Sequence, residues 1–230
     1  MTQITFLLFP HVTQLDLTGP AQVLSRLPEA RVELVAKTLE PVSTDAGFPL
    51  LPSATFETAA PADILCVPGG FGVTAAMEDE ATLAWLRSAA DRAEWITSVC
   101  TGALVLGAAG LLDGYRATTH WASHDYLAAF GAVPVQERVV FDRNRVTGGG
   151  VTAGIDFGLA LTARIAGEEH ARFIQLSLEY DPAPPFDSGS PEKADPAVLE
   201  RYRTMVARHA GDRGDRYRAA AERMRKGPAG

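Results

Sequence analysis

The chain has 230 residues, of which 47% are hydrophobic and 21% are charged, and its formal net charge is −7. This composition is typical of a soluble globular protein and argues against a disordered chain. The acidic balance argues against nucleic acid as a partner, and the lack of a hydrophobic run of roughly 18 residues argues against association with a membrane through a spanning helix.

The N-terminal half alternates short hydrophobic runs with longer helical patterns. The hydrophobic runs predict strands at residues 4–9, 32–36, 64–67 and 95–99. Between them we expect a short helix over 20–27, with Pro20 in its first turn, and a longer helix over 81–93. Residues 46–51 and 53–56 predict a small hairpin or an extended loop.

The C-terminal half continues this alternation. It predicts helices over 101–109 and 154–165, a strand pair at 139–142 and 145–147, and a more polar helical region over 197–226. Hydrophobic strands separated by helices indicate an α/β fold with a mostly parallel sheet and helices on both faces. Such sheets bind ligands beyond the carboxyl ends of their strands. The residues just after the strands are therefore the first candidates for a site.

The chain has two cysteines, too few for a disulfide-stabilised secreted scaffold. Its first residues lack the pattern of a secretory signal, so we expect a cytoplasmic protein. Cys66 lies inside a hydrophobic strand, and we expect it to be an inert core residue. Cys100 follows the strand at 95–99 and begins a predicted helix, which makes it the candidate for chemistry.

Cys100 lies in the segment Ser98-Val99-Cys100-Thr101-Gly102, which has the form of a nucleophile elbow. Small residues two places before and after the nucleophile allow a sharp turn from strand to helix. The dipole and the N–H groups of the following helix lower the pKa of a thiol at this place. We therefore predict a reactive thiolate, with a buried structural cysteine as the alternative.

Asp16 is flanked by two leucines shortly after the first strand and just before a predicted helix. One interpretation is a helix N-cap. The other is a partly buried acid that faces the site, because burial raises the pKa of a carboxyl group and makes it a proton donor near neutral pH. The thiolate expected at a neighbouring strand end favours the second interpretation.

Two glycine-rich segments follow other strands. Gly69 and Gly70 come after the strand at 64–67, and their N–H groups are candidates for an oxyanion hole facing Cys100, with a plain turn as the alternative. Their spacing is not that of a dinucleotide-binding loop. Residues 148–154, which hold three consecutive glycines, predict either a pocket wall or a flexible connector.

The histidines give little support for a metal site. His120 and His124 have the i, i+4 spacing of two ligands on a helix, but the residues between them lack the glutamate of a zinc protease, and no third ligand follows. We therefore expect no metal. His120 is a candidate for the lining of the pocket, with a packed histidine as the alternative.

Five motifs together resemble the ThiJ/PfpI superfamily. They are, in chain order, Asp16-Leu17-Thr18-Gly19-Pro20, Pro68-Gly69-Gly70, Ser98-Val99-Cys100-Thr101-Gly102, Ala117-Thr118-Thr119-His120-Trp121 and Thr152-Ala153-Gly154-Ile155-Asp156. The resemblance implies a flavodoxin-like fold related to class I glutamine amidotransferases. It extends to about residue 191, so we expect an α/β catalytic domain over 1–190 and a C-terminal helical arm over 191–230.

Within the superfamily the motifs are most similar to the isonitrile hydratases, hydro-lyases that add water to an isonitrile to give an N-substituted formamide. This resemblance implies that Cys100 is the nucleophile, that Asp16 is the acid, and that a covalent cysteine thioimidate forms. Thr101 follows the nucleophile where protease-like relatives usually carry histidine, which weighs against proteolysis. The N–H groups near Gly70 and Thr101 are expected to stabilise developing charge.

The resemblance also implies a homodimer that uses neither a metal nor an organic cofactor. The C-terminal arm carries a net charge of +4 against −11 for the rest of the chain. Because opposite charges favour packing on protein, we expect this arm to lie at the dimer interface.

Two other functions stay open at this point. One is a non-enzymatic ligand-sensing domain like those of AraC-type regulators, although the roughly 40 residues after residue 190 are too few for a paired helix-turn-helix module. The other is a glyoxalase-like enzyme or a redox sensor of the same superfamily that uses the same thiol.

Overall fold

A seven-stranded sheet forms the centre of the computed structural model, which describes residues 1–226 apart from the side chains of residues 209 and 210. The sheet contains β1 (Thr2–Leu7), β2 (Ala30–Ala36), β5 (Ala54–Thr55), β6 (Ile64–Val67), β7 (Trp95–Val99), β10 (Val139–Asp142) and β11 (Arg145–Gly148). Their order is β10-β11-β7-β6-β1-β2-β5, and every neighbouring pair is parallel except β10 and β11. The predicted mostly parallel sheet is confirmed.

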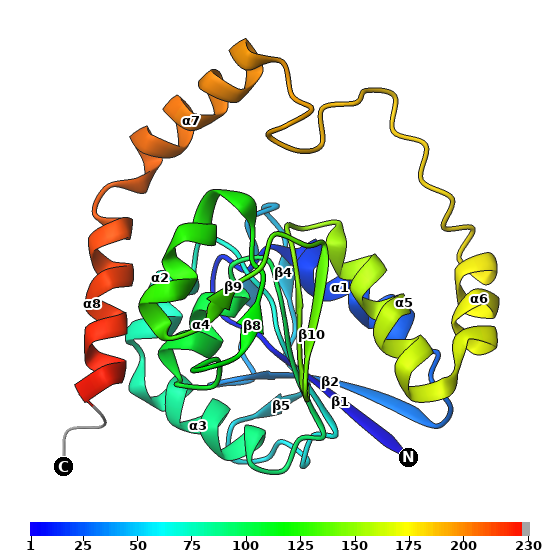
Figure 1. The fold of residues 1–230 in the computed structure, drawn as a ribbon. Coiled ribbons are helices and arrows are strands. Elements are labelled where there is room, and N and C mark those ends of the chain that lie inside the picture. Colours follow the sequence, from blue (N-terminus) through cyan, green and yellow to red (C-terminus); the bar gives the residue numbers. More distant parts are fainter. Residues whose placement is uncertain (227–230) are drawn as a thin grey trace.

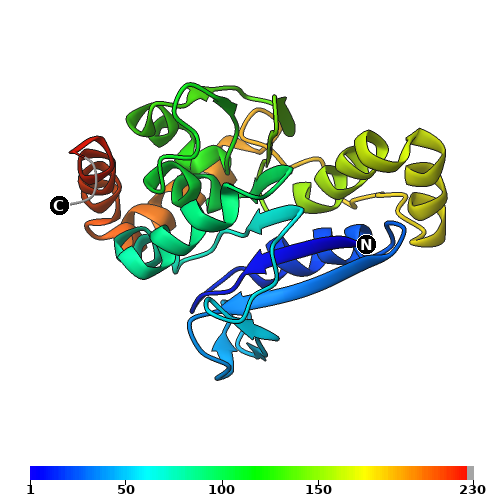
Figure 2. The same ribbon diagram turned by 90° about the horizontal axis from the view of Figure 1, so that it is seen from below.

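Helices lie on both sides of this sheet (Figure 1), as predicted. One side carries α1 (Gln14–Leu24), α5 (Ala153–Ala166) and α6 (Glu168–Ser177). The other side carries α2 (Val73–Glu78), α3 (Glu80–Ala90), α4 (Gly102–Ala108), the 3-10 helix η1 (Trp121–Phe130) and α8 (Arg213–Lys226). Figure 2 shows the two groups of helices with the strands between them.

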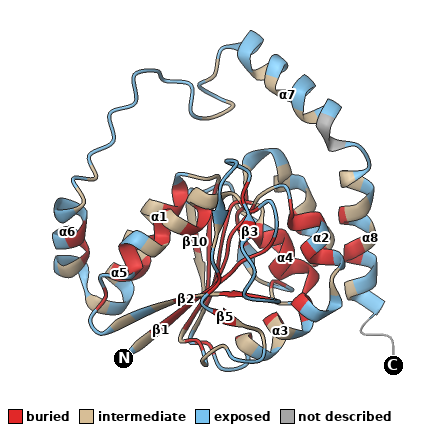
Figure 3. Ribbon diagram, turned by 180° about the vertical axis from the view of Figure 1, so that it is seen from behind, coloured by how far each residue is buried: buried red, intermediate tan, exposed pale blue. Residues whose placement is uncertain are grey.

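The core lies between the central strands and the helices that cover them (Figure 3). Every residue of β6 and of α4 is buried, which explains why both segments are continuously hydrophobic. Cys66 lies in this core, where Thr97 Oγ1 donates a hydrogen bond to its Sγ over 3.0 Å. Burial raises the pKa of the Cys66 thiol to about 12, which agrees with the prediction of an inert core residue.

The first helix begins six residues earlier than predicted. Pro20 was expected in its first turn but lies in the interior of α1, a position where proline costs a backbone hydrogen bond. Its ring packs on α5, because a Cβ atom added to Gly154 would lie 2.9 Å from Pro20 Cδ. Asp16 therefore belongs to the first turn of α1 rather than to a loop before a helix.

Several short elements differ from the prediction. The strand β4 (Pro49–Leu50) pairs with β3 (Val42–Ser43) instead of with the next segment, and β5 joins the edge of the main sheet. A second small pair joins β8 (Arg116–Ala117) to β9 (Val133–Pro134). The helices α2, α6 and η1 have no counterpart in the prediction.

The predicted helical region over 197–226 consists of two helices. The helix α7 (Pro196–Ala210) ends at Gly211, whose φ is +51°, and α8 follows. Residues 178–195 have no regular secondary structure and, with α7, form an arch over the body of the protein (Figure 1). The helix α8 packs on α2, α4 and η1, and it buries Tyr217. Within residues 1–226, none of the helices has the length and hydrophobicity needed to cross a membrane.

Candidate active site

Cys100 occupies a sharp turn between β7 and α4. Its φ is +56°, a strained value for a residue with a side chain. The Cys100 N–H donates to the carbonyl oxygens of Gly148 and Gly149 over 3.1 and 2.8 Å, and Thr119 Oγ1 donates to the Cys100 carbonyl over 2.7 Å. A Cβ atom added to Gly102 would lie 2.1 Å from the Val67 carbonyl oxygen. The predicted turn is therefore present, and glycine at position 102 is a steric requirement.

Asp16 is completely buried and faces the same end of the sheet. Its Oδ2 accepts a hydrogen bond from the Gly69 N–H over 2.9 Å, whereas the N-cap of α1 is Thr13. The capping interpretation is therefore wrong, and the carboxylate instead joins α1 to the segment after β6. Asp16 Oδ1 forms no well-aligned hydrogen bond with any described residue, although the Cys100 thiol acts on the carboxyl group as a weak hydrogen-bond partner.

Burial raises the pKa of Asp16 from 3.8 to about 7. The hydrogen bonds from Gly69 and Cys100 lower this pKa and the nearby charge of Asp45 raises it, but the loss of hydration has the largest effect. A carboxyl group with a pKa of about 7 exchanges its proton readily at neutral pH. The prediction that burial makes Asp16 a usable proton donor agrees with this environment.

The pKa of the Cys100 thiol is raised, contrary to the prediction from its place at a helix start. Burial has the largest effect and the adjacent Asp16 adds to it, whereas N–H groups of Val151 and Thr101 that point at the sulfur lower the pKa. Cys100 is 6% exposed, so the cost of burying a thiolate beside a carboxylate exceeds the stabilisation by the helix. The thiol and the carboxyl group therefore titrate as a coupled pair, in which burial and the charge of Asp16 oppose ionisation of the thiol.

The N–H groups of Gly69 and Gly70 are both engaged inside the protein. Gly69 donates to Asp16, and Gly70 donates to Thr101 Oγ1 over 3.1 Å. A Cβ atom added to Gly69 would lie 2.6 Å from the Thr101 N atom and 2.8 Å from Asp16 Oδ2. The sequence predicted that these two N–H groups are free donors facing Cys100. Instead, one is bonded to the Asp16 carboxyl group and the other to the Thr101 hydroxyl. The donors aimed at the sulfur are the N–H groups of Thr101 and Val151.

His120 borders the site through the glycine-rich segment after β11. Its Nδ1 accepts a hydrogen bond from the Ala122 N–H over 3.2 Å at the start of η1. Its ring lies against Gly150, since a Cβ atom there would be 2.7 Å from His120 Cδ2. Burial lowers the pKa of His120, so its ring is neutral at neutral pH. Because the next residue, Val151, points its N–H at Cys100, residues 148–154 form a wall of the site.

Sequence reasoning missed several contributors. No sequence pattern marks the Val151 N–H as a donor, because every residue except proline has a backbone N–H. Thr119 stands within a motif quoted for the superfamily, which marks it as a candidate, but its bond to the Cys100 carbonyl depends on the tertiary fold. Tyr202, from α7, is also close enough for the charge of Cys100 to raise its pKa, after the larger effect of burial.

A cavity of about 810 Å³ opens elsewhere on the protein and does not include the reactive pair. Its lining comes from the end of β1, residues 36–43, the start of α2 and the start of α8. Two ion pairs border it, Lys37 with Asp79 and Arg216 with Glu78. Cys100 and Asp16 are absent from its lining. Cys100 is 6% exposed and Asp16 is 0% exposed, so the pair is shielded from bulk water, which strengthens the electrostatic interaction between its members.

The arrangement suits the addition of a thiol to a carbon that also needs a proton. A nucleophile, a carboxylate that can accept and return its proton, and two N–H groups directed at the sulfur meet at one buried point. Thiols become nucleophilic when an adjacent base removes the proton. The same base then becomes the acid for the addition product.

Comparison with known proteins gives consistent similarities. The model of the DJ-1/PfpI family matches residues 2–164. The chain is 58% identical over 205 residues to the isonitrile hydratase of Pseudomonas putida, which covers 89% of this chain and 90% of that protein. A ThiJ/PfpI family protein from Pseudomonas syringae has a crystal structure that matches with a TM-score of 0.91 and 46% identity, over 96% of this chain and 90% of that one.

A more distant similarity links the chain to transcription regulators. It is 34% identical over 137 residues to the HTH-type transcriptional regulator GbdR of Pseudomonas aeruginosa, which covers 59% of this chain but only 37% of that protein. The similarity to the isonitrile hydratase spans far more of both chains. It therefore has the greater weight for function.

Proposed function

Because the chain belongs to the DJ-1/PfpI family, we propose that it is an isonitrile hydratase that converts an isonitrile and water into an N-substituted formamide. The observation that carries this proposal is the similarity to the Pseudomonas putida enzyme over most of both chains. The buried pair of Cys100 and Asp16 supports it, because the reaction needs a nucleophile and a proton carrier at one carbon.

The first step forms a bond between sulfur and the isonitrile carbon. Asp16 takes the proton of the Cys100 thiol while the sulfur attacks, and the N–H groups of Thr101 and Val151 stabilise negative charge on the sulfur. The protonated Asp16 then delivers that proton to the same carbon, which carries the electron pair of the former isonitrile. The product is a thioimidate, in which the carbon is bound to hydrogen, to nitrogen by a double bond, and to the cysteine sulfur.

The second step adds water to this thioimidate. The Asp16 carboxylate removes a proton from water as the oxygen attacks the carbon, and it passes that proton to the nitrogen. The carbon–sulfur bond then breaks, the carbonyl of the formamide forms, and the hydroxyl proton returns to the sulfur through Asp16. The enzyme regains its thiol and its carboxylate, so one water molecule is consumed for each isonitrile.

The other predicted site residues support this pair. Gly69 fixes the orientation of the Asp16 carboxylate, and Gly70 fixes the Thr101 hydroxyl. His120 is neutral and borders the wall made by residues 148–154. We propose that it lines the substrate pocket, with its orientation fixed by the hydrogen bond from the Ala122 N–H to its Nδ1.

An activity assay tests the proposed reaction. Purified protein mixed with phenyl isonitrile is expected to form N-phenylformamide with multiple turnovers, followed by absorbance and confirmed by chromatography. Methylglyoxal in a parallel reaction is expected to give no lactate above the background. Multiple turnovers of methylglyoxal without formamide formation would replace the proposal with the glyoxalase-like alternative. The absence of both activities would contradict an enzymatic role.

We also propose that the chain forms a homodimer. Large hydrophobic side chains are exposed on α6 and on residues 178–195, with Phe173 67%, Leu176 81% and Phe186 79% exposed. A second copy that covers these side chains would remove them from water, which favours association. Light scattering is expected to give twice the mass of one chain, and a monomer at micromolar concentration would contradict the proposal.

The arm over 191–230 and the cytoplasmic location also remain proposals. The two helices of the arm differ in their packing, since α8 lies on α2, α4 and η1 whereas α7 belongs to the arch. We propose that the arch, rather than α8, meets the second copy. A cytoplasmic location fits a free, reactive thiol, which a reducing compartment protects. Detection of the protein in a secreted fraction would contradict it.

A further inference from the structure

An aromatic row leads away from the active site toward the C-terminal arm. The rings of His120 and Trp121 have centroids 5.6 Å apart, and the rings of Trp121 and Tyr202 have centroids 5.1 Å apart with a tilt of 42°. Tyr202 lies on α7, eighty-one positions after Trp121 in the sequence. Trp121 is 36% exposed and Tyr202 is half-buried, so part of the row is open to a ligand.

The inner end of this row lies next to the reactive thiol. His120 lies against Gly150, and the following residue, Val151, points its N–H at the Cys100 sulfur. On the other side, Thr119 donates its hydroxyl to the Cys100 carbonyl. His120, at the inner end of the row, therefore follows Thr119 in the sequence and lies against Gly150, the residue before Val151.

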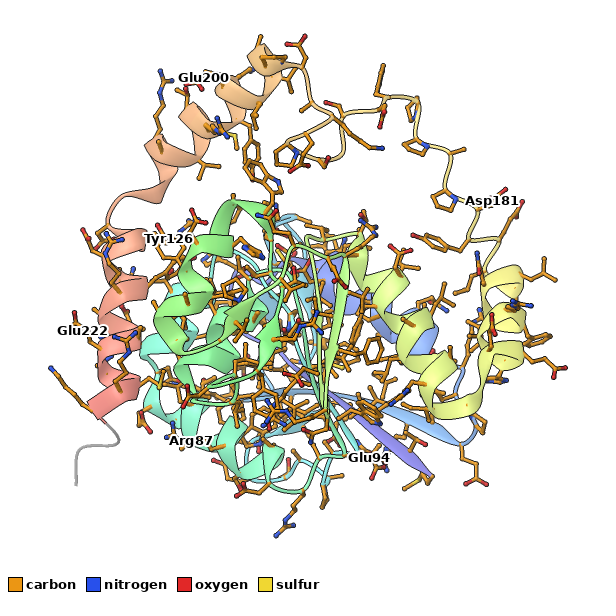
Figure 4. The ribbon with its side chains drawn as sticks, viewed as in Figure 1. Arg87, Glu94, Tyr126, Asp181, Glu200 and Glu222 are labelled. Carbon is orange, nitrogen blue, oxygen red and sulfur yellow. The ribbon has the colours of Figure 1, made fainter. Side chains whose placement is uncertain are left out.

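The outer end of the row lies within electrostatic reach of the same thiol. A thiolate at Cys100 would raise the pKa of Tyr202, after the larger effect of burial, and would also raise that of Tyr217. Glu200, which Figure 4 labels on the same helix α7, is exposed. Tyr126, at the far side of η1, packs instead against Tyr217 of α8, with ring centroids 5.0 Å apart. The two tyrosines of the arm differ in burial and in ring contact: Tyr217 is 2% exposed and packs on Tyr126, whereas Tyr202 is half-buried and contacts Trp121.

The chemistry of the substrate gives this row a use. The reactive carbon of an isonitrile must meet Cys100 and Asp16, so the organic substituent on its nitrogen points away from the buried pair. An uncharged wall of aromatic rings binds flat or bulky hydrophobic groups through burial and ring stacking. A methyl group has too little surface to reach such a wall.

We infer that Trp121 and Tyr202 bind the organic substituent of the isonitrile, and that they make the enzyme selective for aryl and other large hydrophobic isonitriles over methyl isonitrile. This inference rests on the proposed function and names the substrate class of that same site. It also assigns a role to α7, whose ring contact with Trp121 closes the outer side of the substituent site. Selectivity therefore depends on a residue that lies outside the matched family domain of residues 2–164.

The test measures kcat/KM for phenyl isonitrile and for methyl isonitrile in the full-length wild-type protein and in variants. In Tyr202→Ala the ratio of the phenyl value to the methyl value is expected to fall about tenfold, mainly through KM, because a ring contact of this kind is lost. Trp121→Ala is expected to lower the same ratio, and Tyr202→Phe is expected to restore it. Val198→Ala, an exposed change on the same helix, is the matched control and keeps the wild-type ratio.

The outcomes separate this inference from the proposed function. If the wild-type protein hydrates both isonitriles and the ratio is the same in Tyr202→Ala and Trp121→Ala, the inference is overturned while the proposed function stands. An equal loss with both substrates would also overturn it, because that pattern belongs to a residue that only supports the fold. If the wild-type protein hydrates neither isonitrile, the proposed function fails and the substituent site fails with it.

Discussion

Replacing Cys100 with alanine is expected to abolish isonitrile hydration, with kcat falling at least about ten-thousand-fold. The variant keeps Asp16 and the substituent site but has no atom that can bond to the isonitrile carbon. The loss should appear in kcat with every isonitrile, because the missing bond is common to all of them. Initial rates of formamide formation at saturating substrate measure this effect.

The second cysteine supplies the matched control. Cys66 is buried in β6, where Thr97 donates a hydrogen bond to its sulfur, so Cys66→Ala removes a thiol that takes no part in the proposed reaction. Its kcat should stay within about twofold of the wild-type value, although the variant loses the hydrogen bond from Thr97 and some stability. Substantial turnover in Cys100→Ala would show that water attacks the isonitrile directly, and would remove the covalent intermediate from the mechanism.

Replacing Asp16 with asparagine is expected to lower kcat/KM about a hundred- to ten-thousand-fold, the usual range for the loss of a general acid–base group. The amide keeps the shape of the carboxyl group and an oxygen for the Gly69 N–H. It cannot take the thiol proton, however, and it cannot return one to carbon. The exposed Asp91→Asn variant is the control and is expected to keep full activity.

The pH dependence of the wild-type enzyme should show the raised pKa of Asp16. Below about pH 7 Asp16 is protonated, and because the pKa of Cys100 is also raised, both members of the pair hold protons and no base is available. As the pH rises through about 7 the carboxylate forms, so kcat/KM should rise about tenfold per pH unit and then level off. A rate that falls as the pH rises through 7 would show that the doubly protonated pair is the active form.

The same carboxyl group should reduce the stability of the folded protein. Its pKa is about 7 in the folded state against 3.8 for the ordinary group, so the folded state binds this proton more tightly than the unfolded state. The resulting contribution to the free energy of unfolding is complete below about pH 4 and is lost as the pH rises through 7. At pH 8 the cost of keeping the buried carboxylate charged is on the order of 4 kcal/mol. Urea unfolding should therefore find Asp16→Asn at least as stable as the wild-type protein at pH 8. A marked loss of stability there would make Asp16 a structural residue.

The sequence predicted the sheet and the elbow well because their signals are local. The strand over residues 95–99 matches β7 to the residue, since a strand buried on both faces is a continuous hydrophobic run. The elbow was visible because the turn needs glycine at position 102, where a side chain would meet the Val67 carbonyl. The predicted start of the first helix was wrong because proline is common in the first turn of a helix. Pro20 instead lies inside α1, where it packs on Gly154.

The electrostatics of the site could not be predicted from single residues. The place of Cys100 at a helix start suggests a low pKa, but burial and the charge of Asp16, eighty-four positions earlier, reverse the direction. The glycines after β6 suggested free N–H donors, whereas the fold commits them to Asp16 and Thr101. Tyr202 carries no motif and borders the site only through its ring contact with Trp121. Each of these features depends on contacts between distant parts of the chain.

Rapid quenching of the wild-type protein during turnover is the most direct measurement of the covalent mechanism. Protein mixed with excess phenyl isonitrile and quenched within milliseconds should contain a fraction of chains heavier by the mass of one isonitrile, and peptide mapping should place the added mass on Cys100. Continuous formation of formamide while the Cys100 peptide stays unmodified at every quench time would contradict the covalent attack by this sulfur.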